Sequence, residues 1–257
     1  MARRTRFKNR RDDAAVASVA AAYVKRDLPF FDPLNPDVVA GLEAQVDWIL
    51  QEVGIAFCDD PKALEIWRKA GVKPEGDLIK APADWIRALC RKAPSEFTQR
   101  ARNPERSVRI GGAHQVFAPI YGAPFVRDLK QGRRYGDLDS FTKLVKLVQM
   151  LPSLHHSGLV IVEPCDVPVS KRHLDMVYAH MRYTYKPHLG AITEQSRAQD
   201  SVDMAEILHG KEAMDTQCVI LGNVNTHSPL LVDKVVSEAI RTYCGRGQGI
   251  IVVPFIL

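Results

Sequence analysis

The sequence predicts an α/β fold whose main sheet is parallel. From residue 137 onward, short apolar runs typical of buried strands alternate with amphipathic helices. The repeating unit is about 30 residues long, which is the length expected of βαβ units. Residues 37–110 instead have mostly helical periodicity, and residues 111–136 hold β-prone runs. We therefore expect a helical N-terminal extension, a β-hairpin or small sheet, and a βα region over residues 137–257.

The helices of the N-terminal extension are indicated by their caps and apolar stripes. Residues 36–54 carry apolar side chains at helical spacing and end at a glycine. Residues 60–71 begin with a capping aspartate, have proline at the first helical position and stop at a glycine. A third, short helix is expected over residues 82–94. After it, Gly111 and Gly112 separate two β-prone runs, so we expect a hairpin there.

Four buried strands and the helices around them are expected in the βα region. Each strand is a short run rich in β-branched residues, and each helix has one apolar stripe. The strands are expected at residues 157–164, 188–193, 217–225 and 249–257, and the helices at residues 137–150, 170–185, 196–210 and 230–245.

Four strands joined by three helices fit either an open doubly wound sheet or a (β/α)₈ barrel. No GxGxxG or GxxxxGK[ST] motif follows any of the expected strands, which weakens the case for a nucleotide-binding open sheet. A barrel needs eight strands. The barrel interpretation therefore makes residues 137–257 the first half of a TIM-type barrel, truncated after about four strands. The final run, "GIIVVPFIL", would then leave a strand edge that needs cover.

The positive charge of the chain is concentrated at its N-terminus. The formal net charge is +5 for 257 residues, and six positive charges lie between Arg3 and Arg11. Without those six the chain carries −1. We therefore expect residues 1–36 to be a basic, disordered tail and lead-in. No basic stripe with interleaved aromatic residues follows, so nucleic-acid binding is not expected.

Cysteine usage and hydropathy indicate a cytoplasmic protein. The five cysteines are scattered, odd in number and never paired as CxxC, which argues against a disulfide framework and against a zinc–thiolate site. No run of 18 apolar residues and no secretory signal is found, so no membrane association is expected.

Several long blocks of sequence together closely resemble the trimethylamine methyltransferase family. The resemblance extends over about residues 37–257. Its clearest blocks are "ARNPERSVRIGG" (101–112), "VFAPIYGAPFVRDL" (116–129), "LHHSGLVIVEPCDVPVSKRHLDMVYAHM" (154–181) and "GNVNTHSPL" (222–230).

This resemblance implies a fold and a reaction. Family members are corrinoid-dependent methyltransferases that act on trimethylamine or on quaternary amines such as glycine betaine. They are (β/α)₈ barrels with a helical N-terminal extension and are roughly twice as long as this chain. This sequence would be their N-terminal half. The pyrrolysine position of the trimethylamine enzymes would lie beyond Leu257.

The implied reaction moves a methyl group from a methylated nitrogen to the Co(I) corrinoid (cobalamin) of a partner protein. The expected partners are therefore a corrinoid protein and a methylated amine, and the chain itself is expected to bind no metal and no covalent cofactor. A quaternary amine leaves as a neutral amine, so no general acid is required. The site needs a cation pocket, which aromatic rings and a carboxylate can form.

Candidate site residues follow the expected strands, because a barrel builds its site from strand C-terminal ends. Glu163 is a candidate to face the cation, and it alternatively caps the next helix. Asn223 and Asn225 are candidates to bind a polar arm of the substrate or the corrinoid edge, and they alternatively form turns. Phe255 is a candidate for an aromatic wall.

Two further candidates lie outside these strand ends. His155 and His156 are adjacent and point in different directions, so they cannot easily share one metal ion. His156 is a candidate to orient the substrate, against a purely structural role. Tyr121 belongs to an aromatic segment that either covers the barrel mouth or packs between the extension and the barrel.

A second functional interpretation remains open. The chain would then be a catalytically silent half-barrel that needs a second polypeptide or is an inactive gene fragment. Because a half-barrel leaves a parallel sheet uncovered, we expect the chain to form homo-oligomers or to pair with a complementing half-barrel. A metal-dependent hydrolase is disfavoured, since the strand ends offer no evident set of histidine and aspartate ligands.

Overall fold

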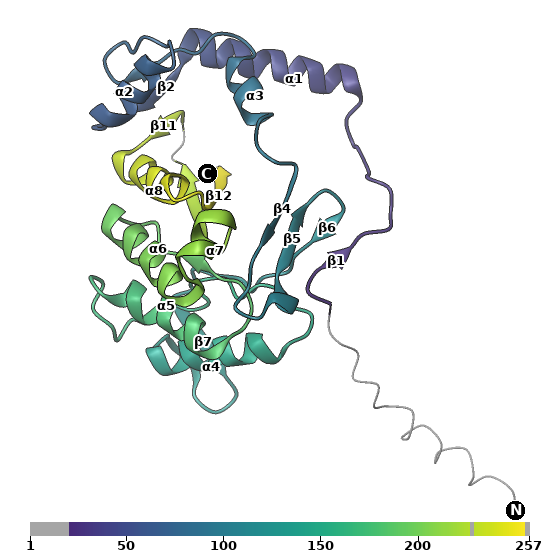
Figure 1. Ribbon diagram of the computed structural model, residues 1–257, viewed down its shortest axis with the longest axis vertical. Coiled ribbons are helices and arrows are strands. Elements are labelled where there is room, and N and C mark those ends of the chain that lie inside the picture. Colours follow the sequence, from purple (N-terminus) through teal and green to yellow (C-terminus); the bar gives the residue numbers. More distant parts are fainter. Residues whose placement is uncertain (1–20, 227–228, 255–257) are drawn as a thin grey trace, which may run out of the picture.

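The computed structural model describes residues 21–226 and 229–254 (Figure 1). Most of the predicted basic tail, residues 1–20, and the candidate Phe255 lie outside the described residues. The described chain forms four small sheets with helices around them. None of these sheets is closed, so the TIM-type barrel stays a prediction. No helix in the described part of the chain combines the length and hydrophobicity that crossing a membrane requires.

The three helices predicted in the N-terminal extension are confirmed. Helix α1 covers Pro36–Trp48, and the side chain of Asn35 caps it by accepting a hydrogen bond from the Val38 N–H at 2.9 Å. It continues as a π-helical turn, Ile49–Val53, and ends at a glycine. Helix α2 covers Pro61–Lys69 and α3 covers Trp85–Cys90.

The extension also contains strands that the helical pattern did not predict. Strands β2 (Ile55–Phe57) and β3 (Leu78–Ile79) pair antiparallel, and β2 also pairs in parallel with β11 (Leu231–Val232). Strand β4 (Glu96–Gln99) joins a four-stranded antiparallel sheet. The order of that sheet is β1-β6-β5-β4, with β1 at Val24–Lys25, β5 at Val108–Gly111 and β6 at His114–Gln115.

The hairpin predicted around Gly111 and Gly112 is confirmed. Strands β5 and β6 are joined there, and both glycines have positive φ, 103° and 52°. A second hairpin follows, formed by β7 (Phe125–Asp128) and β8 (Gly132–Tyr135). The segment expected to hold a small sheet therefore contributes to two sheets.

Three of the four predicted strands of the βα region form one parallel sheet. Its order is β12-β10-β9, with β9 at Leu189–Gly190, β10 at Leu221–Thr226 and β12 at Gly249–Pro254. Consecutive strands are therefore neighbours, as in a βαβ series. The helices beside them are α4 (Leu138–Met150), α5 (Arg172–Tyr183), α6 (Gln195–His209), α7 (Lys211–Thr216) and α8 (Lys234–Gly245).

The strand predicted at residues 157–164 is wrong as a regular strand. This segment is largely buried, but only two hydrogen bonds join it to the segment before and within β9: the Ser157 N–H donates to Pro187 O, and the Leu189 N–H donates to Gly158 O. Gly158 has φ 70°, which breaks the extended backbone. Beyond it, the Gly122 N–H donates to Val160 O at 2.7 Å, so the chain pairs with a loop instead of the sheet.

Tyr243 of α8 fixes the distance between that helix and the parallel sheet. Its ring is fully buried, and its hydroxyl donates to Ala191 O at 2.9 Å. A Cβ atom on Gly222 of β10 would lie 2.8 Å from the ring atom Cδ2. Only glycine at this position lets the helix pack so closely.

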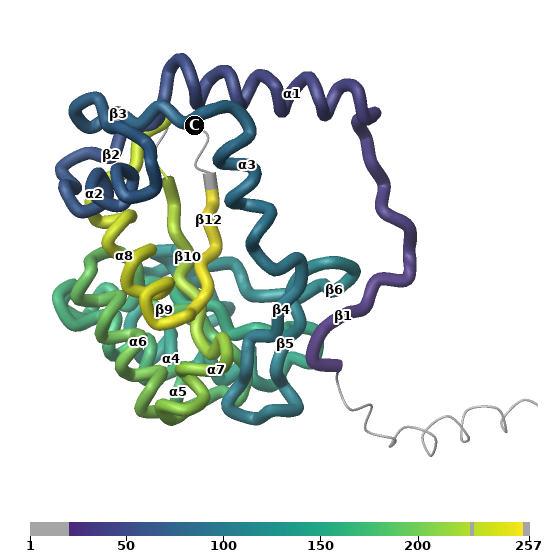
Figure 2. The backbone as a smooth tube through the Cα atoms, turned by 45° about the horizontal axis from the view of Figure 1, so that its top comes forward, coloured from purple at the N-terminus to yellow at the C-terminus, as the bar shows by residue number. Residues whose placement is uncertain are grey.

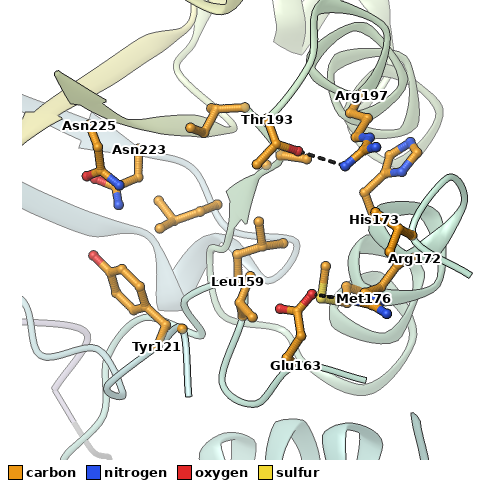
Figure 3. Close-up of a pocket in the computed structure, with 17 residues that line it drawn as sticks. Tyr121, Leu159, Glu163, Arg172, His173, Met176, Thr193, Arg197, Asn223 and Asn225 are labelled. Carbon is orange, nitrogen blue, oxygen red and sulfur yellow. Dashed lines mark hydrogen bonds and ion pairs between the residues drawn. The ribbon is translucent and has the colours of Figure 1, made fainter. Parts of the chain in front are cut away.

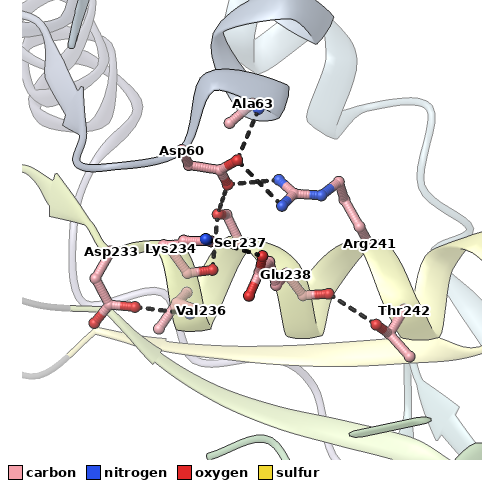
Figure 4. Close-up of polar contacts among 9 residues, drawn as sticks. All are labelled: Asp60, Ala63, Asp233, Lys234, Val236, Ser237, Glu238, Arg241 and Thr242. Atoms are coloured by element: carbon pink, nitrogen blue, oxygen red, sulfur yellow. Dashed lines mark hydrogen bonds and ion pairs between the residues drawn. The ribbon is translucent and has the colours of Figure 1, made fainter. Parts of the chain in front are cut away.

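The N-terminal extension is tied to the βα region by a buried polar link (Figure 4). Asp60 caps α2 by accepting from the Ala63 N–H at 3.1 Å. The same carboxylate accepts two hydrogen bonds from Arg241 of α8, at 2.6 and 3.2 Å, and one from the Ser237 hydroxyl. The predicted boundary between the two regions is therefore crossed by side-chain contacts as well as by the β2–β11 pair.

Candidate functional site

A cavity of about 240 Å³ lies at the carboxyl ends of β9 and β10 (Figure 3). The first turns of α5 and α6 form one side, and the loop before β7 closes another. Four of the residues proposed from the sequence line this cavity together: Tyr121, Glu163, Asn223 and Asn225. The structure therefore places the ends of predicted strands around one space, as parallel strands require.

The period of β10 presents both asparagines on one face. Asn223 and Asn225 alternate with Val224, which is fully buried on the opposite face against Val232 and Val236. The Asn223 Oδ1 atom is buried and has no hydrogen-bond partner in the part of the chain that the structure describes. An unpaired buried carbonyl is costly, so this oxygen is available for a ligand.

Glu163 forms an ion pair with an arginine of the same cavity. The Arg172 Nη1 atom donates to Glu163 Oε1 at 2.6 Å, and Arg172 also donates to Val167 O from Nε and Nη2. The Glu163 side chain is 32% exposed and that of Arg172 is 15% exposed. The negative charge proposed to face a cation is therefore already balanced by a guanidinium.

Two polar side chains extend this side of the cavity. His173, which follows Arg172 in α5, is buried, and its Nε2 donates to Asp200 Oδ2 at 2.8 Å. Its Nδ1 has no partner among the described residues. Arg197, in the first turn of α6, donates from Nη1 to Thr193 Oγ1 at 3.0 Å. The exposed Glu194 carboxylate lies 3.0 Å from Arg197 Nε.

Tyr121 is 43% exposed and stands on the opposite side of the view in Figure 3 from Arg197 and His173. Its loop is held by the hydrogen bonds from Gly122 N–H to Val160 O and from Glu163 N–H to Ala123 O. The aromatic segment therefore does both things considered for it: it packs against the βα region and contributes one ring to the cavity.

The structure corrects the proposal that His156 contacts the substrate. His156 does not line the cavity and is 5% exposed. Its Nδ1 accepts from the Gly158 N–H at 2.9 Å, and its Nε2 donates to Gln99 Oε1 at 3.1 Å. Both ring nitrogens are therefore used inside the protein, so His156 has a structural role.

A group of buried histidines supports the cavity from below. Burial lowers the pKa of His156 to about 3 and that of His180 to about 4. His180 Nε2 donates to the carbonyl of Leu159, a cavity residue, at 2.8 Å, and its Nδ1 accepts from Ser157 Oγ at 2.7 Å. These rings are neutral at physiological pH and hold the backbone under the cavity.

Sequence reasoning missed Arg172, His173 and Arg197. It considered only residues that directly follow strands. The first turn of each following helix also opens at that edge of a βα unit, so these positions could have been included. Among the described residues, no group of three histidine, cysteine, aspartate or glutamate side chains is arranged to hold a metal ion.

The model of the family described as trimethylamine methyltransferase (MTTB) matches residues 2–257. The chain belongs to the trimethylamine methyltransferase family. This confirms the resemblance found in the sequence. Within the family, the chain is 36% identical over 231 residues to a glycine betaine methyltransferase of Desulfitobacterium hafniense (strain Y51), covering 90% of this chain and 48% of the relative.

A second relative is the proline betaine:corrinoid methyltransferase of Eubacterium limosum. It is 26% identical over 219 residues, which is 80% of this chain and 44% of the relative. The chain thus spans about half the length of the curated family members that it matches.

Proposed function

We propose that this chain provides the methyl-donor cavity of a corrinoid-dependent methyltransferase that acts on a methylated amine. Membership of the family and the names of the two relatives support the reaction class. The observation that carries the proposal is the cavity itself. It gathers an aromatic ring, two amides and an apolar floor at the carboxyl ends of β9 and β10.

The cavity fits the amine and not the corrinoid. A volume of about 240 Å³ accommodates a small methylated amine, whereas a corrinoid macrocycle is far larger. We therefore propose that the corrinoid is carried by a partner protein and meets the methyl group at the open side of the cavity. When bound there, it supplies the Co(I) nucleophile that accepts the methyl group.

The residues of this chain would orient the donor and exclude water. The Tyr121 ring offers a π-face to the positive nitrogen, and the unpaired Asn223 Oδ1 offers a partial negative charge. Leu159, Met176 and Ile192 make the floor apolar. In the transfer from a quaternary amine, the C–N bond breaks and its electron pair stays on nitrogen. The amine leaves neutral, so orientation is the main contribution of this chain.

We also propose that β9, β10 and β12 are consecutive strands of a (β/α)₈ barrel. Their parallel order supports this, as does the position of the cavity at their carboxyl ends. The remaining strands would come from a polypeptide equivalent to the other half of the relatives.

The donor cavity is tested by titrating the chain with trimethylamine, tetramethylammonium and glycine betaine, following the N-methyl proton resonance of each by NMR. We expect at least one to bind, and we expect Tyr121→Leu to weaken binding by about 3- to 10-fold through loss of the cation–π contact. Tyr178→Leu is the matched control, because Tyr178 is exposed on α5 and does not line the cavity. Absence of binding by all three amines would refute the proposal.

A further inference from the structure

The charges that line the cavity do not suit a simple cation. Its lining contains one carboxylate, Glu163, and two guanidinium groups, Arg172 and Arg197. The only carboxylate is paired with Arg172 at 2.6 Å. A ligand that carries only a positive charge would therefore meet a net positive lining. A ligand that also carries an anionic group would find a complementary partner.

The side of the cavity that carries positive charge is defined by two helix N-termini. Helices α5 and α6 have 12 and 15 residues, and neither has a side-chain hydrogen bond to its N-terminal turn. The positive end of each helix dipole therefore lies beside Arg172 and Arg197. Helix N-termini favour carboxylate and phosphate groups for this reason.

Arg197 is the side chain best prepared to bind an anion there. Its Nη1 donates to Thr193 Oγ1 and its Nε lies beside Glu194, so the guanidinium is held in place. Its Nη2 has no protein partner within residues 21–226 and 229–254. The side chain is 18% exposed, so a charge-assisted hydrogen bond would be partly shielded from water.

His173 independently indicates that a ligand belongs here. The residue is 5% exposed and lines the cavity, and its Nδ1 has no partner in the described part of the chain. A polar atom buried without a partner destabilises a protein unless something else satisfies it. In Figure 3, His173 and Arg197 stand together on one side, away from Tyr121 and the two asparagines.

We propose that Arg197 and the first turn of α6 bind the carboxylate of a zwitterionic methyl donor, while Tyr121 and Asn223 face its quaternary ammonium group. The donor class is thus a small N-methylated betaine and not a simple methylated amine. This rests on the proposed function and makes Arg197 the residue that determines donor specificity.

The test compares glycine betaine with choline, which has the same trimethylammonium group and a hydroxyl group in place of the carboxylate. Both are titrated into the chain by calorimetry. We expect glycine betaine to bind at least about tenfold more tightly than choline. We expect Arg197→Met to weaken betaine binding by about 10- to 100-fold and to leave choline binding within about twofold. Arg68→Met, an exposed change on α2, is the control and should alter neither.

The outcomes separate this inference from the proposed function. If both ligands bind equally well, or if Arg197→Met weakens both equally, the carboxylate subsite is refuted and the donor cavity stands. If neither ligand nor trimethylamine binds, both proposals fail. Should Arg197→Met not fold, as judged by circular dichroism, Arg197→Lys keeps the charge and loses the planar fork. It should reduce betaine affinity selectively, and an unchanged ratio of the two affinities would overturn the inference.

Discussion

At the scale of single residues, hydrogen bonds determine which nitrogen of each buried histidine carries the proton. His156 Nδ1 accepts from a backbone N–H, so its proton is on Nε2 and is donated to Gln99. His180 donates from Nε2 to a carbonyl, so its Nδ1 is the acceptor. A protonated ring would have one N–H facing a donor, which adds to the cost of burying charge.

These histidines predict that acid destabilises the fold. The pKa values of His156 and His180 are about 3 and 4 in the folded chain, against about 6.5 when unfolded. Between these values the unfolded state binds more protons, so stability is complete above about pH 6.5 and falls as the pH decreases. We expect each histidine to cost about 2 kcal/mol at pH 5. Urea unfolding between pH 5 and 8 measures this.

A variant isolates one titrating group. His156→Gln should reduce the slope of unfolding free energy against pH by about 1.4 kcal/mol per unit between pH 5 and 6, whatever its effect on stability at pH 8. A slope equal to that of the unchanged chain would contradict the assignment of His156 as a neutral buried base.

At the scale of elements, Asp60 joins two helices that are distant in sequence. It caps α2 and accepts from both Arg241 and Ser237 of α8, while being only 2% exposed. Burial alone would raise its pKa, but the hydrogen bonds from Arg241, Ser237 and the Ala63 N–H outweigh burial and lower it. The carboxylate is therefore ionised and attaches the N-terminal extension to the βα region.

Removing this carboxylate should destabilise the chain strongly. Asp60→Ala loses the cap and leaves Arg241 unpaired, so we expect a loss of about 3–5 kcal/mol by chemical denaturation. Asp137→Ala is the matched control, since Asp137 caps α4 through the Ser140 N–H and accepts no arginine hydrogen bond. It should cost about 1 kcal/mol. Equal losses in the two variants would show that the link to α8 contributes nothing.

At the scale of the whole molecule, α1 presents an unpartnered apolar face. Figure 2 shows this helix along the edge of the molecule, joined to the β1 sheet by a long lead-in. Val39, Leu42, Val46 and Trp48 are 40–56% exposed, and Val252 of β12 is 54% exposed. Side chains of this kind gathered on one helix indicate a surface that another polypeptide covers.

This face predicts self-association of the isolated chain. We expect oligomers by light scattering at micromolar concentration, and we expect Leu42→Glu with Val46→Glu to shift the population toward monomer because charge opposes apolar contact. Leu129→Glu is the control, because Leu129 is fully exposed on the β7–β8 turn, away from α1. A monodisperse monomer before any substitution would contradict the prediction.

Local patterns were sufficient for some features and insufficient for others. The caps and stripes of α1 and α2 and the β-branched runs of β10 and β12 are encoded within short windows, so the sequence predicts them. The segment 157–164 has a strand-like composition, but its conformation depends on Gly158 and on pairing with a loop more than thirty residues earlier. The same holds for the site. Asn223 and Asn225 follow from alternation, whereas Arg197 depends on which helix turn opens onto the cavity.

The position of the cavity has a consequence for how the family can diversify. Its polar side chains stand on the last residues of strands and the first turns of helices, while the packed core lies beneath them. A substitution at these ends changes what the cavity accepts without repacking helices against the sheet. Selection can therefore exchange one methyl donor for another through few mutations, each nearly neutral for folding. The scaffold would be inherited intact while the diet of its host changes.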